Sequence, residues 1–367
     1  MKAGRSLTEL ATEIERRRDA KQDFIAPARK LSASVETKDE RPQVVLNLAG
    51  QDSFPLTPYA HGQMAGYLEI PKRYYDRMLI DAPDILTQSI DRWLHRDHGD
   101  DRRMIRTLDG RVRAVLSDRY RAMENEDLAE AIFPVLSELG LMVMSAEITD
   151  RRFYIKAVDE RITRDIPTGH HMGDGTHTIF DTVSPAISIG NSEIGAGTLY
   201  FNTAIWTRAC TNLADMGTSL KKYHSGSRAE ISDEVYALLS DDTRARTDEA
   251  LWMQARDITK AAFEEAKFEA LTNKLVDATK DEIDDSPVEV VERARKKFTW
   301  TDGERDSVLT HLVKGGDLTR YGLHAAVTRS AEDFSDYDRA SEFERLGGEI
   351  IELNQRDWKE LSVKRAA

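Results

Sequence analysis

The sequence predicts an α+β protein: a mainly antiparallel sheet with helices on one side, followed by a helical C-terminal region. Asp109-Gly110 lies between two strand-like runs and favours a two-residue type I′ hairpin turn. Two longer β segments, 186–194 and 198–209, flank a short glycine-containing connection. Helical periodicity then dominates from about Gly226 onward, which separates the sheet from a C-terminal helical region.

The N-terminal elements follow from local signals. Ser6 and Glu9 match a capping box, so a first helix is expected to begin there. Residues 19–41 are polar and are expected to form an irregular arm, and residues 44–48 a short strand. Prolines at the first helical position predict three further helices, which begin at Pro58, Pro71 and Pro83.

Later elements are expected from periodicity and capping. After the hairpin, a helix is expected over 125–139 and strands over 141–149 and 152–158. One or two long helices are expected within 231–283, and capping boxes predict helices after Ser286 and Thr301. A last helix is expected to break or kink near Gly347-Gly348. The predicted organisation is 1–40 helix and arm, 41–225 core domain, and 226–367 acidic helical region packing on the core.

The net charge argues against nucleic-acid binding only when it is summed over the whole chain. The chain has 367 residues, with 52 Lys+Arg against 65 Asp+Glu and a net charge of −13. Residues 226–367 hold 22 Lys+Arg and 32 Asp+Glu, or −10, and residues 1–225 hold 30 and 33, or −3. The N-terminal part is therefore nearly neutral and is able to present a basic face.

The hairpin region concentrates arginine. A two-residue turn would place Arg106 opposite Arg113, and like charges in that position destabilise a sheet. A phosphate backbone would remove this penalty, whereas nearby carboxylates or solvent are the alternative. Tyr120 lies between two arginines, a combination typical of single-strand binding; a place in the core is the alternative for its ring. The candidate nucleic-acid contacts are Arg102, Arg103, Arg106, Arg111, Arg113, Arg119, Tyr120 and Arg121.

Other polar motifs are weaker. Asn191-Ser192-Glu193 is a candidate ligand loop at a strand end beside glycines, although a structural turn explains it equally well. Cys210 with His224 as base is disfavoured as a nucleophile, because a small packing residue is the simpler role. The histidines of the 170–177 segment lack metal-ligand spacing. We therefore expect no catalytic residue, metal or cofactor.

Four stretches carry a resemblance to a known family. They are Pro71–Arg77, Ser117–Asn125, Asn191–Gly197 followed by Cys210–Asn212, and Tyr321–Thr328. Over about residues 40–350 the chain resembles the phage/plasmid-like proteins of domain-of-unknown-function family 932. His324 departs from that pattern, where asparagine is expected. The resemblance implies a setting in mobile-element DNA metabolism, and the layout is similar, at fold level, to single-strand annealing recombinases.

The leading hypothesis is a non-catalytic phage or plasmid protein that binds DNA, favours single strands and takes part in annealing during recombination or replication. One alternative is a protein-interaction or structural component that uses the acidic helices. Another is a nucleotide-acting enzyme that uses Asn191, Ser192 and Glu193 with a metal or His224. We expect the protein in the cytoplasm of a bacterial host, because no secretory signal or apolar membrane span is evident. We also expect it to form a homo-oligomer.

Overall fold

The computed structural model describes residues 1–49, 52–171, 178–208, 212–222 and 240–363. Pairing between the named strands is antiparallel throughout these residues, and helices predominate from residue 240 onward. The expected α+β class with a helical C-terminal region is therefore confirmed. Within the described part of the chain, every helix is too short or too polar to cross a membrane.

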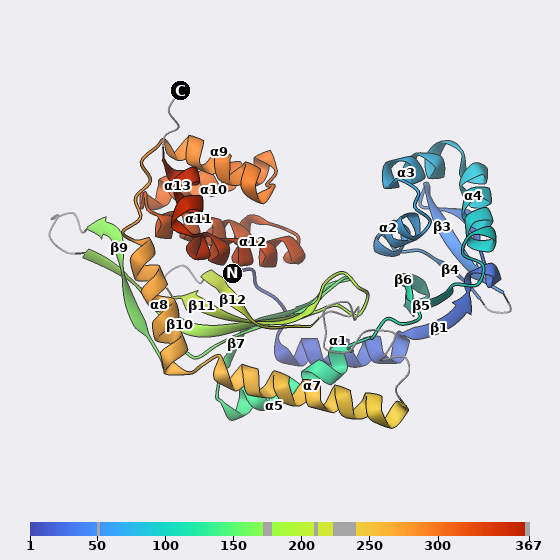
Figure 1. Cartoon of the computed structure of the whole chain (residues 1–367), viewed down its shortest axis with the longest axis horizontal. Coiled ribbons are helices and arrows are strands. Elements are labelled where there is room, and N and C mark those ends of the chain that lie inside the picture. The colour runs from blue at the N-terminus through green and yellow to red at the C-terminus, as the bar shows by residue number, and fades with distance from the viewer. Residues whose placement is uncertain (50–51, 172–177, 209–211, 223–239, 364–367) are drawn as a thin grey trace.

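A small lobe forms one end of the molecule (Figure 1). It contains two three-stranded sheets, β1-β5-β6 and β2-β3-β4, and three helices that share one apolar core with them. The expectation of an irregular arm over 19–41 is wrong, because β1 and β2 obtain backbone partners from β5 and β3. The elements of the lobe are β1 (Gln22–Pro27), β2 (Leu31–Lys38), β3 (Arg41–Leu48), β4 (Ser53–Pro55), α2 (Pro58–Tyr67), α3 (Lys72–Asp81), α4 (Pro83–Arg96), β5 (Arg102–Leu108) and β6 (Arg111–Ser117).

The Asp109-Gly110 hairpin is confirmed, but its register is not the expected one. Asp109 (φ 52°) and Gly110 (φ 69°) both have positive φ, as a type I′ turn requires. The ladder shifts beyond Thr107, so Arg106 lies opposite Ala114. The expected Arg106–Arg113 pairing is therefore wrong. A bulge adds one residue, Arg113, to β6, so Arg113 has no residue directly opposite it on β5.

The central sheet has the strand order β12-β11-β10-β8-β7, with β9 paired to one end of β10. Its strands are β7 (Met142–Ile148), β8 (Phe153–Val158), β9 (Arg164–His171), β10 (Thr178–Asn191), β11 (Leu199–Thr207) and β12 (Asn212–Lys222). The four strands expected between residues 141 and 209 are present as β7, β8, β10 and β11, whereas β9 and β12 are not expected from the sequence.

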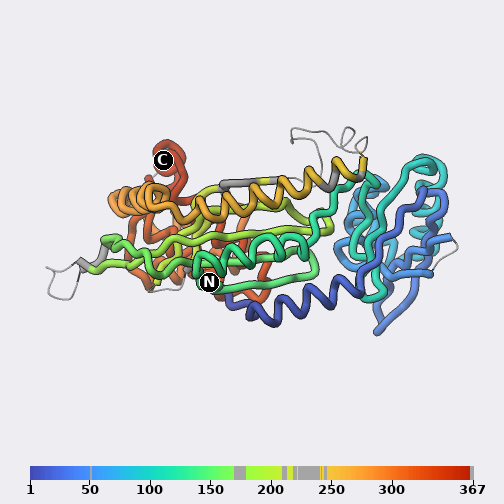
Figure 2. The backbone as a smooth tube through the Cα atoms, turned by 90° about the horizontal axis from the view of Figure 1, so that it is seen from below, coloured from blue at the N-terminus to red at the C-terminus, as the bar shows by residue number. Residues whose placement is uncertain are grey.

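Helices cover both faces of this sheet (Figures 1 and 2). Along one face run α1 (Leu7–Ala20), α5 (Asn125–Glu138) and α7 (Asp241–Ala261). They enclose an apolar core with alternate strand residues, among them Ile155, Ile187 and Phe201. The capping box expected at the start of α1 is present.

The opposite face is covered by C-terminal helices, and α12 lies directly on β12. Thr301 and Glu304 form the expected capping box, whereas Ser286 makes no side-chain cap. The helices beyond α7 are α8 (Glu265–Ala278), α9 (Pro287–Phe298), α10 (Asp302–Gly315), α11 (Arg320–Ser330), α12 (Tyr337–Glu352) and α13 (Gln355–Ser362).

Helix α12 runs through Gly347 and Gly348 without the expected break. A Cβ atom at Gly348 would lie 1.7 Å from the Asp215 carbonyl oxygen, and one at Gly347 would lie 2.3 Å from Thr328 Cγ2. The glycine pair therefore allows α12 to pack closely between α11 and β12.

Candidate functional site

The two faces of the central sheet differ in chemistry. On the face toward α12, Lys156 of β8, Ser188 of β10 and Asn202 of β11 are cross-strand neighbours and are all buried. In the adjacent row the Tyr200 ring lies over Gly190. Buried polar side chains are costly unless they are paired or serve a ligand, so this face is the first place to seek a site.

A pocket of about 540 Å³ lies between this polar face and α12. A volume of this order is typical of small-molecule sites. The pocket joins the small lobe, the sheet and the C-terminal helices. Its lining consists of Tyr59, Arg151, Arg152, Tyr154, Ala196, Gly197, Thr198, Tyr200, Asn202, Asp215, Lys221, Asp336, Asp338, Arg339, Ser341, Glu342 and Arg345.

A buried ion pair lies behind the pocket wall. Lys156 Nζ lies 2.5 Å from Glu344 Oε2 and donates a hydrogen bond to Ser341 Oγ at 3.1 Å. Burial opposes ionisation of Lys156, but Glu344 overcomes this effect and raises the pKa of the lysine. The pair links the sheet to α12, and removing one partner of such a pair is strongly destabilising.

Asp215 and Asn202 form the polar floor of the pocket. Asn202 Nδ2 donates a hydrogen bond to Asp215 Oδ2 at 2.9 Å. Burial raises the pKa of Asp215 to about 6, although the hydrogen bond from Asn202 opposes this rise. The carboxyl group therefore changes charge just below neutral pH, as groups in functional sites often do.

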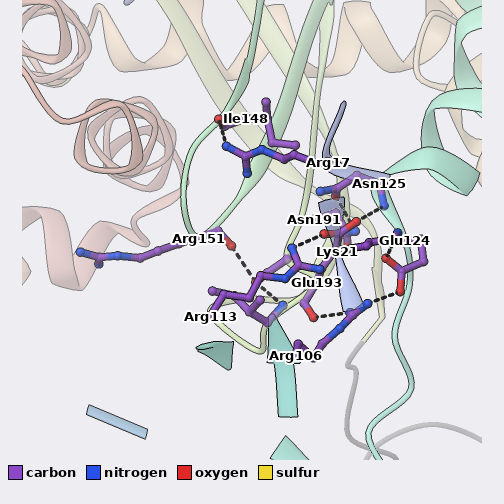
Figure 3. Close-up of polar contacts among 12 residues, drawn as sticks. Arg17, Lys21, Arg106, Arg113, Glu124, Asn125, Ile148, Arg151, Asn191 and Glu193 are labelled. Atoms are coloured by element: carbon purple, nitrogen blue, oxygen red, sulfur yellow. Dashed lines mark hydrogen bonds and ion pairs between the residues drawn. The ribbon is translucent and has the colours of Figure 1, made fainter. Parts of the chain in front are cut away.

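The lining of the pocket combines three tyrosines with five cations and four carboxyl groups. Arg151 and Lys221 are exposed, and the Arg151 guanidinium extends away from the neighbouring charged cluster (Figure 3). Arg152 instead donates to the Ala196 carbonyl and holds the β10–β11 connection in place. Tyr59 is half-buried and lines the pocket from the small lobe. Cations beside tyrosines suit a ligand with both an anionic group and a flat ring.

Two of the predicted phosphate contacts lie in a buried charged cluster between the small lobe and the central sheet (Figure 3). Arg106 is 1% exposed; it binds Asp23 directly across the β1–β5 pair and binds Glu124 at 2.5 Å. Arg113 Nη1 lies 2.6 Å from Glu193 Oε2. Phosphate contact at Arg106 and Arg113 is no longer expected, because both side chains are buried and each already pairs with a carboxylate. We name this cluster the interlobe hub, and its members are Lys21, Asp23, Arg106, Arg113, Glu124 and Glu193.

The candidate ligand loop belongs to the same hub. Glu193 Oε1 accepts a hydrogen bond from the Asn125 amide at the N-terminus of α5, a favourable place for a carboxylate. Burial opposes ionisation of Glu193, but Arg113 and this amide hold its pKa below the usual value. Asn191 Nδ2 donates to Asn125 Oδ1, and Ser192 Oγ donates to a backbone carbonyl of the β7–β8 connection. All three residues of the loop therefore have partners within the protein, and Asn191 Oδ1 is the one of their buried side-chain atoms without a hydrogen-bond partner among the described residues.

The other predicted nucleic-acid contacts are dispersed. The Arg103 guanidinium stacks over the Tyr67 ring at 3.6 Å, and Arg121 pairs with a carboxylate of α7. The Tyr120 hydroxyl donates to one backbone group and accepts from another within residues 192–195. The structure therefore does not gather the eight predicted residues on one surface. Three of the predicted arginines occupy exposed positions: Arg102, Arg111 and Arg119.

The remaining sequence candidates are only partly described. Cys210, His177 and His224 lie outside the described residues, and His170 and His171 end β9. Across the described ranges, no group of His, Cys, Asp or Glu side chains is arranged to hold a metal ion.

Sequence patterns did not predict the pocket, although one signal for it is present. Successive side chains of a strand point to opposite faces of the sheet, so Tyr154 and Lys156 of β8 share one face, as do Tyr200 and Asn202 of β11. A lysine in the buried phase of a central strand is the feature that could have drawn attention to this face.

Comparison with known proteins finds no matching family model, no curated relative and no similar solved structure. The case for a function therefore depends on the residues of the pocket and their chemistry.

Proposed function

We propose that the chain is a non-catalytic DNA-binding protein that favours single strands and that the pocket beneath α12 is where it binds them. The observation that carries the proposal is a pocket whose lining combines three tyrosines with five cations and four carboxyl groups, in a chain whose net charge is −13. Local charge decides where a polyanion binds, because fields from distant surface charges are screened within about 8 Å at physiological salt. This proposal moves the site from the hairpin to the pocket.

The dimensions of the pocket support a preference for unpaired bases. A volume of about 540 Å³ accommodates a nucleotide, whereas a duplex hides its bases inside a stack. Tyr59 and Tyr200 supply ring faces, and Arg151 and Lys221 supply charges for phosphates. Stacking combined with backbone charge is the common way to bind single strands.

The test is fluorescence anisotropy with a labelled single strand of mixed sequence at several salt concentrations. We expect affinity to fall with salt, and the double reversal Arg151→Glu/Lys221→Glu to reduce the salt slope by about 0.7 for each phosphate that is no longer neutralised. The matched control is Arg73→Glu/Arg92→Glu, which makes the same charge change at exposed positions of α3 and α4. Wild-type protein that binds no single strand, or equal reductions in both double variants, would contradict the proposal.

The annealing role within this proposal requires two strands to be held together. Self-association of the chain would supply a second pocket, and light scattering with and without oligonucleotide measures it. If the protein remains monomeric when it is saturated with oligonucleotide, annealing by paired subunits is ruled out, whereas single-strand binding is not.

A nucleotide-acting enzyme is the second candidate, and one observation favours it. Asp215 lines the pocket and has a pKa of about 6, which suits a general acid or base near neutral pH. Turnover of a nucleotide that depends on Asp215 would replace the non-catalytic proposal with this one.

A further inference from the structure

The floor of the pocket carries two buried side-chain oxygen atoms that accept no hydrogen bond from the described residues. Asp215 is 7% exposed and Asn202 is 5% exposed, and both line the pocket. Asp215 Oδ1 and Asn202 Oδ1 have no hydrogen-bond partner among the described residues. A buried acceptor without a partner is costly, so two of them at a pocket floor indicate donors on a ligand.

The hydrogen bond between the two side chains sets their orientation. Asn202 Nδ2 donates to Asp215 Oδ2, and an ionised carboxylate only accepts, so the amide must use its nitrogen for this bond. The carboxylate and the amide therefore each keep one oxygen for a ligand. The β11–β12 register shifts on both sides of Asn202, with the extra residues on β12, and bulges commonly re-aim side chains next to sites.

Among the DNA bases, guanine matches two neighbouring acceptors. Its Watson–Crick edge carries a ring N1–H beside an N2 amino group, whereas adenine, cytosine and thymine each place an acceptor beside their donor. Phosphate would lie toward Arg151 and Lys221 at the rim, and the Tyr200 ring provides an aromatic wall. A floor of two acceptors would repel the acceptor edge of the other bases.

Building on the proposed function, we infer that the pocket selects guanine, with Asp215 Oδ1 and Asn202 Oδ1 accepting from its N1–H and N2 amino groups. The same chemistry is offered by guanine within a strand and by a free guanine nucleotide. The experiment therefore includes both sources.

The strand arm uses labelled oligothymidylate with one central guanine, inosine or adenine. We expect guanine to bind about ten-fold or more tightly than adenine, since one bidentate base contact discriminates by about that factor. Inosine keeps N1–H and lacks the amino group, so an intermediate affinity is expected. This series uses wild-type protein and does not depend on any variant being folded.

The variant arm compares Asp215→Asn with Asp109→Asn, the same change at the hairpin turn. Asp215→Asn is expected to bind guanine and adenine strands equally, while Asp109→Asn keeps the preference. The free-nucleotide arm measures competition by dGMP against dAMP, and dGMP is expected to compete more strongly.

These outcomes distinguish guanine selection from strand binding. Strands that bind with equal affinity whatever the central base would overturn guanine selection and leave strand binding intact. Binding of dGMP without binding of any strand would support guanine selection and overturn the strand-binding function. An unchanged guanine preference in Asp215→Asn would also overturn guanine selection by this floor.

Discussion

The interlobe hub and the pocket floor both bury charged groups, but they differ in the space beside them. In the hub, three cations face three carboxylates, and the cavity lined by Arg113 and Glu193 has a volume of about 10 Å³. That is the room of about one water molecule. The floor of Asp215 and Asn202 opens instead on about 540 Å³. The hub is therefore suited to joining the lobe to the sheet, and the floor to meeting a ligand.

This difference also shows why arginine density is misleading. Arg106 is separated by more than eighty residues from Asp23 and from Glu193, whose backbone carbonyl it also binds. Composition along the chain shows the cations but not the distant acids that neutralise them. Four substitutions, of decreasing expected effect, test the distinction between structural and ligand-binding charges.

Arg106→Ala is expected to lower the free energy of unfolding by about 3–5 kcal/mol, because it removes a buried cation that binds Asp23, Glu124 and the Glu193 carbonyl. Urea denaturation measures this decrease. Folded Arg106→Ala protein should still bind the single strand with wild-type affinity. A decrease below about 1 kcal/mol would show that the hub does not join the small lobe to the sheet.

His324 should make the α11–α12 packing sensitive to acid. Burial lowers its pKa to about 4, and its Nδ1 lies 2.9 Å from the Gly347 carbonyl of α12. Because the folded pKa lies below the unfolded value of about 6.5, the stabilisation is complete above pH 6.5 and is lost as pH falls toward 4, by about 3 kcal/mol. His324→Asn should lose less stability between pH 7 and 4 in urea titrations. An identical acid effect in both proteins would contradict this assignment.

Asp215→Asn is expected to stabilise the ligand-free protein, the opposite of the hub variant. The pKa of Asp215 rises from 3.8 to about 6, so ionisation opposes folding above pH 6 by about 2–3 kcal/mol. The gain should appear at pH 8 and disappear below pH 4, where the carboxyl is protonated in both states. Thermal unfolding at the two pH values measures it. A variant that is less stable than wild type at pH 8 would show that the ionised Asp215 stabilises the fold, as the charges of the interlobe hub do.

Arg111→Glu should have the smallest effect. Arg111 is exposed and donates one hydrogen bond to the Leu56 carbonyl, so the stability change is expected within about 0.5 kcal/mol. Oligonucleotide affinity should stay close to that of wild type in the same anisotropy assay. A large decrease in affinity would indicate that the oligonucleotide binds at the hairpin and not in the pocket.

Local rules predict much of the fold. The caps at Ser6 and Thr301 and the Asp109-Gly110 turn depend on neighbouring residues, and the structure contains them. The failures depend on distant partners. Residues 22–38 become strands through pairing with β3 and β5, and the uninterrupted course of α12 through its glycine pair is explained by the closeness of β12.

The pocket could not be predicted for the same reason. Its floor joins Asn202 of β11 to Asp215 of β12, and a strand at 212–222 is not expected from the sequence. Its cover is α12, more than one hundred residues later in the chain. The sequence shows the polar residues of β8 and β11, but only the register of the sheet shows that they are neighbours on one buried face.

Photochemical cross-linking would decide whether the pocket, and not the hairpin, holds the single strand. A strand containing 5-bromodeoxyuridine beside its central base would be irradiated on wild-type protein, and the adducts located by mass spectrometry. We predict adducts on tyrosines of the pocket, Tyr59 or Tyr200, that disappear in Arg151→Glu/Lys221→Glu. Adducts confined to residues 102–121, and unchanged in that variant, would contradict binding in the pocket.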